Sequence, residues 1–245
     1  MPVFTRNLLL SSLASEEIEA LRPHLKPVGL EQTKILYEAG DGITGVYFPF
    51  DAVISLVVVL STGESVEAAM VGRDGVVGAS SALDGKLALN RAIVQIGGSG
   101  VVCDPETFKR LVLQYPAMLS LIISHEQTVY AQVQQSAACN ITHDATERLC
   151  RWMLRARDLS GSDTLPFTQE FLAEMLGVRR TTVSPVAHTL QAAGMIQYRR
   201  VKIQIMDLEG LRESACECYA TVRDRYEQLL GRERNTRPEN AIPSA

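Results

Sequence analysis

Arginine and hydroxyl-bearing side chains gather within residues 168–205, in a pattern that suits contact with the edges of DNA bases. The stretch FLAEMLGVRRTTVSPVAHTLQAAGMI at 171–196 predicts two short helices joined at Gly177, because glycine readily adopts the left-handed backbone of a tight turn. Thr168 can cap the first helix through its hydroxyl. The second helix has apolar residues at helical spacing on one side and polar residues near its start on the other.

Two helices arranged in this way around a glycine form a helix-turn-helix, whose second helix enters the major groove N-terminus first. An arginine there can bind guanine O6 and N7 together, a contact worth about 1–3 kcal/mol of base discrimination. We therefore predict a recognition helix near residues 179–191. The candidate DNA-binding residues of the two helices are Gln169, Arg179, Arg180, Thr181, Ser184 and His188.

The run MIQYRRVKIQIMDL, directly after Gly194, alternates in the manner of a β-hairpin and predicts a wing beside the two helices. Its Arg199, Arg200 and Lys202 could touch phosphates, which positions a protein on DNA without reading sequence. The chain has a net charge of -4, but residues 168–205 carry five Lys and Arg against two Asp and Glu, a local balance of +3. Binding to DNA depends on this local face. The alternative is an ordinary helical hairpin whose arginines are solvated.

Pro185 falls inside the predicted recognition helix, about six residues beyond a cap at Arg179. There it removes one backbone hydrogen bond and crowds the carbonyl of Thr181, at a cost of about 3 kcal/mol. Because the apolar spacing continues past the proline, we expect a kinked helix that is not broken. The hypothesis is that the kink re-aims Arg180 in the groove.

The rest of the chain predicts elements that hold this segment. Between Thr33 and Asp104, short β-rich runs alternate with turn signals, a pattern typical of an all-β sandwich, roll or barrel. The segment that begins at Pro116 predicts a helix of about 25 residues with a near-heptad apolar stripe. That stripe could pack on the chain's own β unit, but pairing with a second copy is favoured. It consists of Met118, Leu121, Ile122, Val129 and Val133.

Further helices are expected over residues 141–159 and over Leu211–Leu230, and the polar tail at 232–245 is expected to be loose. The length of 245 residues allows one large domain or two of ordinary size. No apolar run approaches the roughly 20 residues that span a bilayer. The start of the chain lacks the pattern of a signal peptide, so a cytoplasmic location and no membrane partner are expected.

The whole chain resembles the Crp–Fnr superfamily of bacterial transcription regulators. The resemblance is carried by FLAEMLGVRRTTVSPVAHTLQAAGMIQY and, less specifically, by GRDGVVG and NRAIVQ. It implies an α+β fold: a jelly-roll-like, double-stranded β-roll at 1–115, a dimerisation helix at 116–140 and a winged helix-turn-helix at 141–231. It also implies a homodimer on a palindromic operator with half-sites about 34 Å apart, and RNA polymerase as a further partner. Arg180 matches the family's recognition helix, but its acidic reader and second arginine are missing, so the usual operator is not carried over.

Family members that bind cyclic nucleotides use a Gly-Glu pair for the ribose and an Arg-Ala or Arg-Ser pair for the phosphate. The corresponding effector-pocket candidates here are Gly78, Ala79, Arg91 and Ala92. The arginine is present but the carboxylate is missing, which disfavours a cyclic nucleotide, and Arg91 could equally be a structural ion-pair residue. The alternative function is an effector-binding module that responds to a nucleotide or redox signal, with DNA binding secondary.

Neither a cofactor nor catalysis is expected. The oxygen sensors of the superfamily bind an iron–sulphur cluster through cysteines near the N-terminus, whereas the first of the five cysteines here is Cys103. Cys216 and Cys218, expected on one helix, would point to different faces, and the spacing around His143 matches no zinc template, so no metal is expected. Oxidation of Cys216 or Cys218 stays open as a minor alternative. No phosphate loop, dinucleotide fingerprint or nucleophile elbow is present, so an enzyme is not expected.

Overall fold

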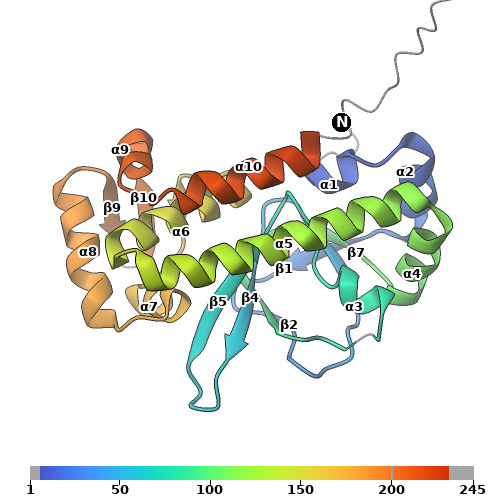
Figure 1. Ribbon diagram of the computed structural model, residues 1–245, viewed down its shortest axis with the longest axis horizontal. Helices are drawn as coiled ribbons and strands as arrows, with labels where there is room; N and C mark the ends of the chain where they lie inside the picture. The colour runs from blue at the N-terminus through green and yellow to red at the C-terminus, as the bar shows by residue number, and fades with distance from the viewer. Residues whose placement is uncertain (1–5, 86, 200, 232–245) are drawn as a thin grey trace, which may run out of the picture.

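A computed structural model describes residues 6–85, 87–199 and 201–231 of the chain. Its N-terminal half consists of strands framed by short helices, and its C-terminal half is mainly helical (Figure 1). The N-terminal elements are α1 (Leu8–Ser11), α2 (Ser15–Leu21), the 3₁₀ turn η2 (Arg22–His24), β1 (Lys26–Leu30), β2 (Ile35–Tyr37), β3 (Val46–Pro49), β4 (Val53–Val59), β5 (Ser65–Val71), α3 (Ala79–Leu83), β6 (Arg91–Ile96), β7 (Gly98–Cys103) and α4 (Pro105–Gln114).

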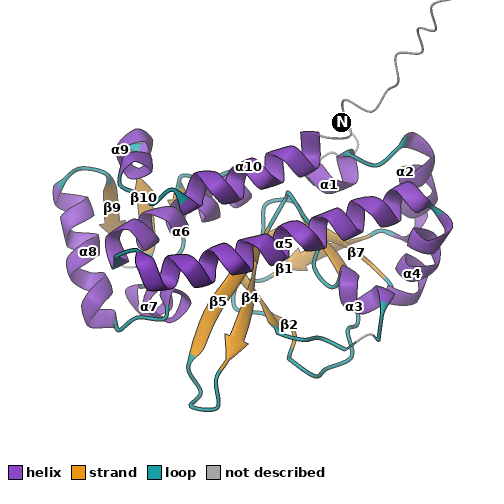
Figure 2. Cartoon of the chain, in the orientation of Figure 1, coloured by secondary structure: helices purple, strands orange, loops and turns teal. Residues whose placement is uncertain are grey.

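The strands β1 to β7 form two antiparallel sheets (Figure 2). One sheet has the order β1-β7-β3 and the other has the order β2-β6-β4-β5. Side chains from both sheets, such as Phe48, Ile54 and Val94, are buried in one core because strands alternate inward and outward residues. The predicted N-terminal roll and the α+β fold class are therefore confirmed.

The long helix α5 (Pro116–Thr142) follows the roll and runs across it toward the C-terminal domain (Figure 1). Pro116 is tolerated because it stands at the first helical position, where no backbone N–H is needed. The predicted apolar stripe lies against the roll: Met118 and Ile122 are only 1% and 3% exposed. The prediction that this stripe pairs with a second copy is therefore wrong, since its residues already pack against the core of the roll in the same chain.

The C-terminal half is a compact helical unit with a small sheet. Its elements are α6 (Ala145–Ser160), β8 (Thr164–Leu165), α7 (Gln169–Leu176), α8 (Arg180–Ala192), β9 (Ile196–Arg199), β10 (Lys202–Ile205), α9 (Leu208–Glu213) and α10 (Cys218–Gly231). Trp152 of α6 forms the centre of its core, with an edge-on contact to Phe167 at 4.7 Å between ring centroids. The sheet order is β8-β10-β9, so the hairpin β9–β10 is the predicted wing.

The last helix differs from the sequence prediction. Instead of one helix over Leu211–Leu230, the short α9 ends at Glu213 and α10 begins at Cys218. The cap of α9 is Asp207, whose side chain accepts a hydrogen bond from the backbone N–H of Gly210. Helix α10 then runs alongside α5 and returns to the roll, where Tyr226 joins the roll core (Figure 1). The apolar spacing of the segment continues through the break, which is why the sequence did not reveal it.

Several contacts join the roll to the C-terminal domain. The indole N–H of Trp152 donates to Glu67 of β5 at 2.9 Å, and the buried guanidinium of Arg155 pairs with Asp74 at 2.8 Å. Val57 of β4 also belongs to the hydrophobic cluster around Trp152. Within the described residues, no helix combines the length and apolar character that crossing a bilayer requires. The tail at 232–245 lies outside the described residues.

Candidate DNA-binding surface

The first helix of the predicted motif and its turn form as the sequence indicates. The hydroxyl of Thr168 accepts a hydrogen bond from the backbone N–H of Phe171 at 3.2 Å and caps α7. Gly177 ends the helix with φ +62°, the left-handed conformation that glycine adopts without strain. Leu172 and Leu176 are buried and fix α7 against the core of the domain.

Helix α8 follows this turn and is anchored by three buried side chains, Val183, Ala187 and Leu190. Arg179 is its N-cap residue, and the helix continues through Pro185 without interruption. The prediction that Pro185 does not break the helix is therefore confirmed, and the kink expected there stays a prediction. With its apolar side buried, the opposite side of α8 is left facing solvent.

The predicted contact residues lie on that solvent-facing side. Arg179, Arg180, Thr181 and His188 are exposed, while Ser184 and Gln169 are half-buried. The hydroxyl of Ser184 donates to the side-chain oxygen of Gln169 at 2.6 Å, so this bond links α8 to the start of α7. The structure thus brings these six residues together on one surface.

Arg180 has a partner that the sequence did not suggest. Its Nη1 lies 2.5 Å from Oε1 of Glu170, the second residue of α7, and both side chains are more than half exposed. The two residues are ten positions apart, which matches no spacing rule for neighbours on one helix. Their contact exists because the turn at Gly177 folds α8 back across α7. The predicted contact residue Arg180 is therefore held by a carboxylate in this structure.

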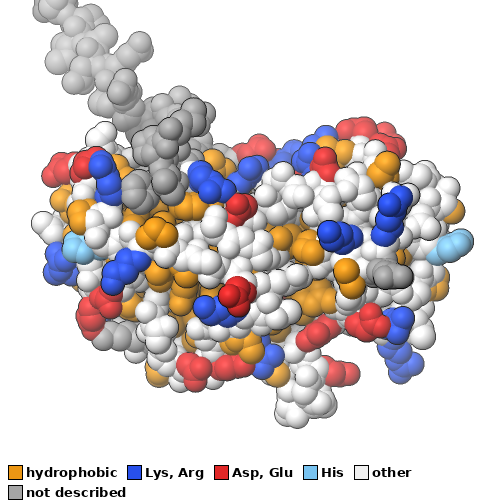
Figure 3. All heavy atoms as spheres, turned by 180° about the vertical axis from the view of Figure 1, so that it is seen from behind, with side chains coloured by type: hydrophobic (Ala, Val, Ile, Leu, Met, Phe, Trp, Pro, Cys, Tyr) orange, Lys and Arg blue, Asp and Glu red, His pale blue; other side chains and the backbone are white. Residues whose placement is uncertain are grey.

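The wing places further cations beside α8. Arg199 and Lys202 are paired residues across the β9–β10 hairpin, and both are exposed. The third predicted wing residue, Arg200, lies outside the described residues. The backbone N–H of Tyr198 donates to the side chain of Gln191 at 2.9 Å, which ties the wing to the end of α8. Figure 3 shows Lys and Arg side chains, with acidic ones among them, at the end of the molecule that carries this domain.

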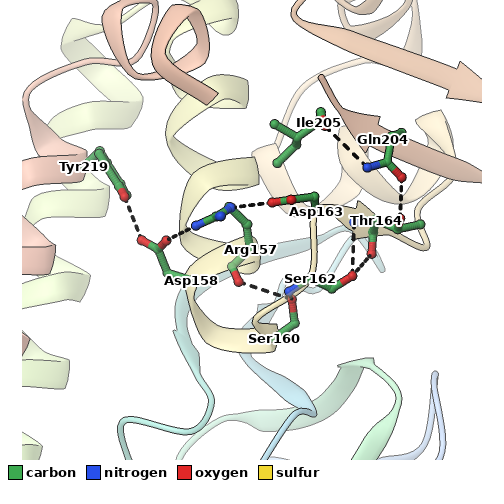
Figure 4. Close-up of polar contacts among 9 residues, drawn as sticks. All are labelled: Arg157, Asp158, Ser160, Ser162, Asp163, Thr164, Gln204, Ile205 and Tyr219. Carbon is green, nitrogen blue, oxygen red and sulfur yellow. Dashed lines mark hydrogen bonds and ion pairs between the residues drawn. The ribbon is translucent and has the colours of Figure 1, made fainter. Parts of the chain in front are cut away.

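A chain of polar contacts braces the base of the wing (Figure 4). At the end of α6, Arg157 donates from Nε to Asp163 at 2.7 Å, and its neighbour Asp158 accepts from the hydroxyl of Tyr219 at 2.7 Å. The hydroxyl of Thr164 in β8 contacts the side chain of Gln204 in β10. These contacts link the wing sheet to α6, and α6 to α10.

Glu67 connects the roll to this domain through an unusual environment. One carboxylate oxygen accepts from Trp152, and the other accepts from Ser55 at 2.5 Å and from Gln95 at 3.1 Å. Burial raises the pKa of Glu67 to about 7, although these hydrogen bonds and the charge of Arg151 act in the opposite direction. The contact between the two domains therefore contains a group that titrates near neutral pH.

The effector-pocket candidates lie near a cavity between the roll and α5, but they do not share it. The cavity has a volume of about 300 Å³, and Gly78 lines it together with Tyr37 and Tyr130. Ala79 and Ala92 are fully buried in the roll core. Arg91 donates from Nε to Glu38 at 2.8 Å, and this hydrogen bond raises its pKa. The structure therefore shows Arg91 as an ion-pair residue, one of the two interpretations that the sequence left open.

Comparisons with known proteins fit this geometry. The family described as the Crp-like helix-turn-helix domain matches residues 147–214. No match was found among curated proteins. Among solved structures, FixK2 from Bradyrhizobium japonicum has 14% identity and a TM-score of 0.66, covering 78% of this chain and 98% of its own. TTHA1359, a CRP/FNR-family regulator from Thermus thermophilus, has 21% identity and a TM-score of 0.63, with coverage of 78% and 98%.

The regulator CLP from Xanthomonas campestris, described as responsive to c-di-GMP, has 16% identity and a TM-score of 0.62, with coverage of 78% and 99%. At these identities the likeness to solved structures establishes the fold, and the domain match supplies the link to DNA binding. The matched family is one of transcription regulators rather than enzymes. The chain therefore has the fold of the Crp/Fnr regulators and carries a Crp-like helix-turn-helix domain over residues 147–214, which confirms the predicted fold and the predicted type of DNA-binding domain.

Proposed function

We propose that the protein binds a two-fold-symmetric operator as a homodimer, with α8 of each copy in one major groove. The observation that carries the proposal is the orientation of α8: Val183, Ala187 and Leu190 hold its apolar side in the core, and its N-terminal side chains face outward. A helix anchored in this way reaches base edges with its first residues. Arg180 is the proposed reader of base identity, and Thr181, Ser184 and His188 lie beside it.

The remaining cations have a different role in this proposal. Arg179, Arg199 and Lys202 are exposed at the N-cap of α8 and on the wing, where they would contact phosphates on either side of the groove. Arg200 is assigned to the same role from its sequence position alone. Phosphate contacts fix the register of a protein on DNA but do not read sequence. The operator sequence is therefore expected to depend on Arg180 more than on the wing.

The proposed dimer uses a different face of α5 from the one predicted by the sequence. The six residues of the exposed stripe follow one another at intervals of four, three, four, three and four, which is the heptad spacing of a coiled-coil seam. Its larger apolar members are strongly exposed in a single chain, with Ile123 at 48%, Tyr130 at 64% and Ile141 at 86%. A second copy would cover them. The stripe consists of Ile123, Gln127, Tyr130, Gln134, Ala137 and Ile141.

The dimer proposal is tested by Ile123→Asp, which places a charge at the N-terminal end of this stripe. We expect the variant to be monomeric in light scattering at a concentration where the wild type is dimeric, because an unpaired buried charge is strongly unfavourable at an interface. The matched control is Leu113→Asp, since Leu113 is 59% exposed on α4 and lies off the stripe. A wild-type protein that is itself monomeric would overturn the proposal.

DNA recognition is tested by selecting binding sites from random duplexes with the purified protein. Selection is expected to return palindromic sites. Arg180→Ala is expected to lose about 1–3 kcal/mol of preference at one base pair of each half-site while keeping much of its affinity for random DNA. Arg22→Ala serves as the control, because Arg22 is also an exposed arginine paired with a carboxylate, Glu19, but lies before the roll. Equal behaviour of the two variants would contradict the role given to Arg180.

A second candidate function is suggested by the cavity of about 300 Å³ between the roll and α5. A small molecule bound there would touch both the roll and the proposed dimer helix, and it could bias DNA binding. This is the effector-responsive alternative, with a nucleotide or a redox signal as input. Mobility shifts with and without candidate nucleotides or oxidants separate it from a regulator that binds DNA unaided. As a transcription regulator the protein is also proposed to contact RNA polymerase and to act in the cytoplasm, where the chromosome is.

A further inference from the structure

Three cysteines and a histidine converge where α5 ends and α10 begins. Cys139 lies in the last turn of α5, and His143 directly follows that helix. Cys216 lies in the loop before α10, and Cys218 is the first residue of α10. All three thiols are buried, whereas the histidine is partly exposed. One ligand atom from each of the four residues lies within 4.8 Å of every other.

The break between α9 and α10 makes this arrangement possible. On one continuous helix, residues 216 and 218 would point to different faces. The sequence prediction of no metal rested on that expectation and on the lack of a zinc spacing template around His143. In the structure Cys216 precedes the helix, so both thiols turn toward Cys139. Cys216 and Cys139 are 77 positions apart in the sequence, so no short spacing template could have joined them.

The separations match the edges of a small tetrahedron. The Sγ atoms of Cys139 and Cys216 are 3.6 Å apart, and Sγ of Cys218 is 3.6 Å from Nδ1 of His143. In a tetrahedral zinc site, Zn–S bonds of about 2.3 Å and a Zn–N bond of about 2.0–2.1 Å set these edges at about 3.8 Å and about 3.6 Å. A single ion therefore fits between the four atoms after small side-chain adjustments. Sulphurs this close leave no room between them for an iron–sulphur cluster.

The surroundings are those that a metal-bound histidine and thiolates need. Nε2 of His143 lies 3.1 Å from a carboxylate oxygen of Glu217, which would orient the ring with Nδ1 toward the ion. The side-chain amide of Gln135 donates to Sγ of Cys218 at 3.0 Å. Arg148 and Arg151 act on the Cys139 thiol through their charge. They would offset the net negative charge of an ion held by three thiolates and one imidazole.

We infer that Cys139, His143, Cys216 and Cys218 form a closed, structural site for one zinc ion that ties the end of α5 to the start of α10. Soft sulphur and nitrogen ligands select zinc over magnesium or calcium, which prefer oxygen. Four protein ligands leave no open position for a substrate or water, so the role is structural and not catalytic. The ion would fasten α10, and through it the DNA-binding domain, to the helix proposed as the dimer interface.

The test begins with the full-length wild type purified under reducing conditions. Elemental analysis is expected to find one zinc per chain, and replacement by Co²⁺ should give the intense visible bands of a tetrahedral site together with thiolate-to-cobalt charge transfer. Cys216→Ser and His143→Gln should lose most of the metal in competition with a chelator that the wild type withstands. Cys103→Ala is the matched control, since it removes a buried thiol outside the cluster.

Glu217→Gln supplies a measurement that does not depend on removing a ligand. The variant should still give the tetrahedral cobalt spectrum, but with metal affinity lowered about 10–100-fold, because the residue only orients the histidine. Reduced wild type that contains no zinc and shows no tetrahedral cobalt spectrum would overturn the inference. A Cys139–Cys216 disulfide that persists in the reduced preparation would overturn it as well. Both results would leave the proposed DNA binding untouched, since that is measured separately by site selection.

Discussion

Glu170→Gln is expected to tighten operator binding, which is unusual for a change of a single exposed residue. In the protein without DNA, Arg180 is paired with Glu170 at 2.5 Å. If Arg180 is the base-reading residue, that pair must break or be shared when α8 enters the groove. Glutamine keeps the shape of the side chain but removes the charge. The variant therefore releases Arg180 without disturbing the fold of α7.

The size of the effect follows from the exposure of the pair. The side chains of Arg180 and Glu170 are 64% and 59% exposed, so the pair is worth about 0.2–1 kcal/mol, as measured for solvent-exposed ion pairs. If operator binding no longer has to break this ion pair, the affinity for the operator rises by about 1.5- to fivefold. The loss of a negative charge close to the phosphates acts in the same direction. Both contributions shrink as salt is added, because exposed charges are screened.

The assay is a titration of labelled operator with wild type, Glu170→Gln, Arg180→Ala and the double variant at two salt concentrations. The gain from Glu170→Gln should be smaller in the Arg180→Ala background, because the partner that it releases is missing there. Glu209→Gln on α9 is the matched control, since Glu209 is an exposed carboxylate paired with Arg212. Weaker operator binding by Glu170→Gln would refute the reasoning and would show that the carboxylate itself contacts DNA or aligns Arg180 for it.

Three further predictions follow from the same structure. Lys202→Ala should weaken binding to the operator and to random DNA about equally, and it should reduce the slope of log affinity against log salt by about one. DNA titrations over a series of salt concentrations check this prediction. A loss of affinity confined to the operator would contradict it. Pro185→Ala should raise the free energy of unfolding, by up to about 3 kcal/mol, and should change the selected operator sequence. Melting curves measure the first effect and site selection measures the second. An unchanged operator sequence would disprove the hypothesis that the proline re-aims Arg180. In the wild type, the free energy of unfolding should fall as pH rises from 4.5 to about 7, because Glu67 holds its proton more tightly in the folded state than in the unfolded state. Above that pH the titration of Glu67 should cause no further change in the free energy of unfolding. Between pH 5 and pH 8 this fall in the free energy of unfolding should amount to about 1–3 kcal/mol in the wild type, and Glu67→Gln should abolish it, as measured by denaturant unfolding at the two pH values.

The recognition motif could be predicted from the sequence because each of its parts is set locally. The hydroxyl of Thr168 caps the helix that follows it, and Gly177 is the residue that a left-handed turn favours. The spacing of Val183, Ala187 and Leu190 assigns one side of α8 to the core, which leaves Arg180 outside. These rules act over a few residues, so they hold before any tertiary contact is known.

The face of α5 that a partner could cover was decided only by the tertiary structure. Two apolar stripes run along this helix, and the sequence shows both at helical spacing. Packing on the roll and on α10 buries Met118 and Ile122, which leaves Ile123 and Tyr130 exposed. Which stripe of α5 is buried depends on how the roll and α10 pack against this helix. Helical periodicity contains no information about that packing.

The cysteine cluster and the Arg180–Glu170 pair are likewise contacts that the tertiary structure decided and the sequence did not. The sequence alone determined the two helices of the recognition motif and which residues of α8 face outward, because periodicity and capping are local. The contact between Cys139 and Cys216, 77 positions apart, depends on the interruption between α9 and α10 and on the path of α10 beside α5. Such long-range contacts are set by how completed elements pack, so only the folded chain could bring these groups together.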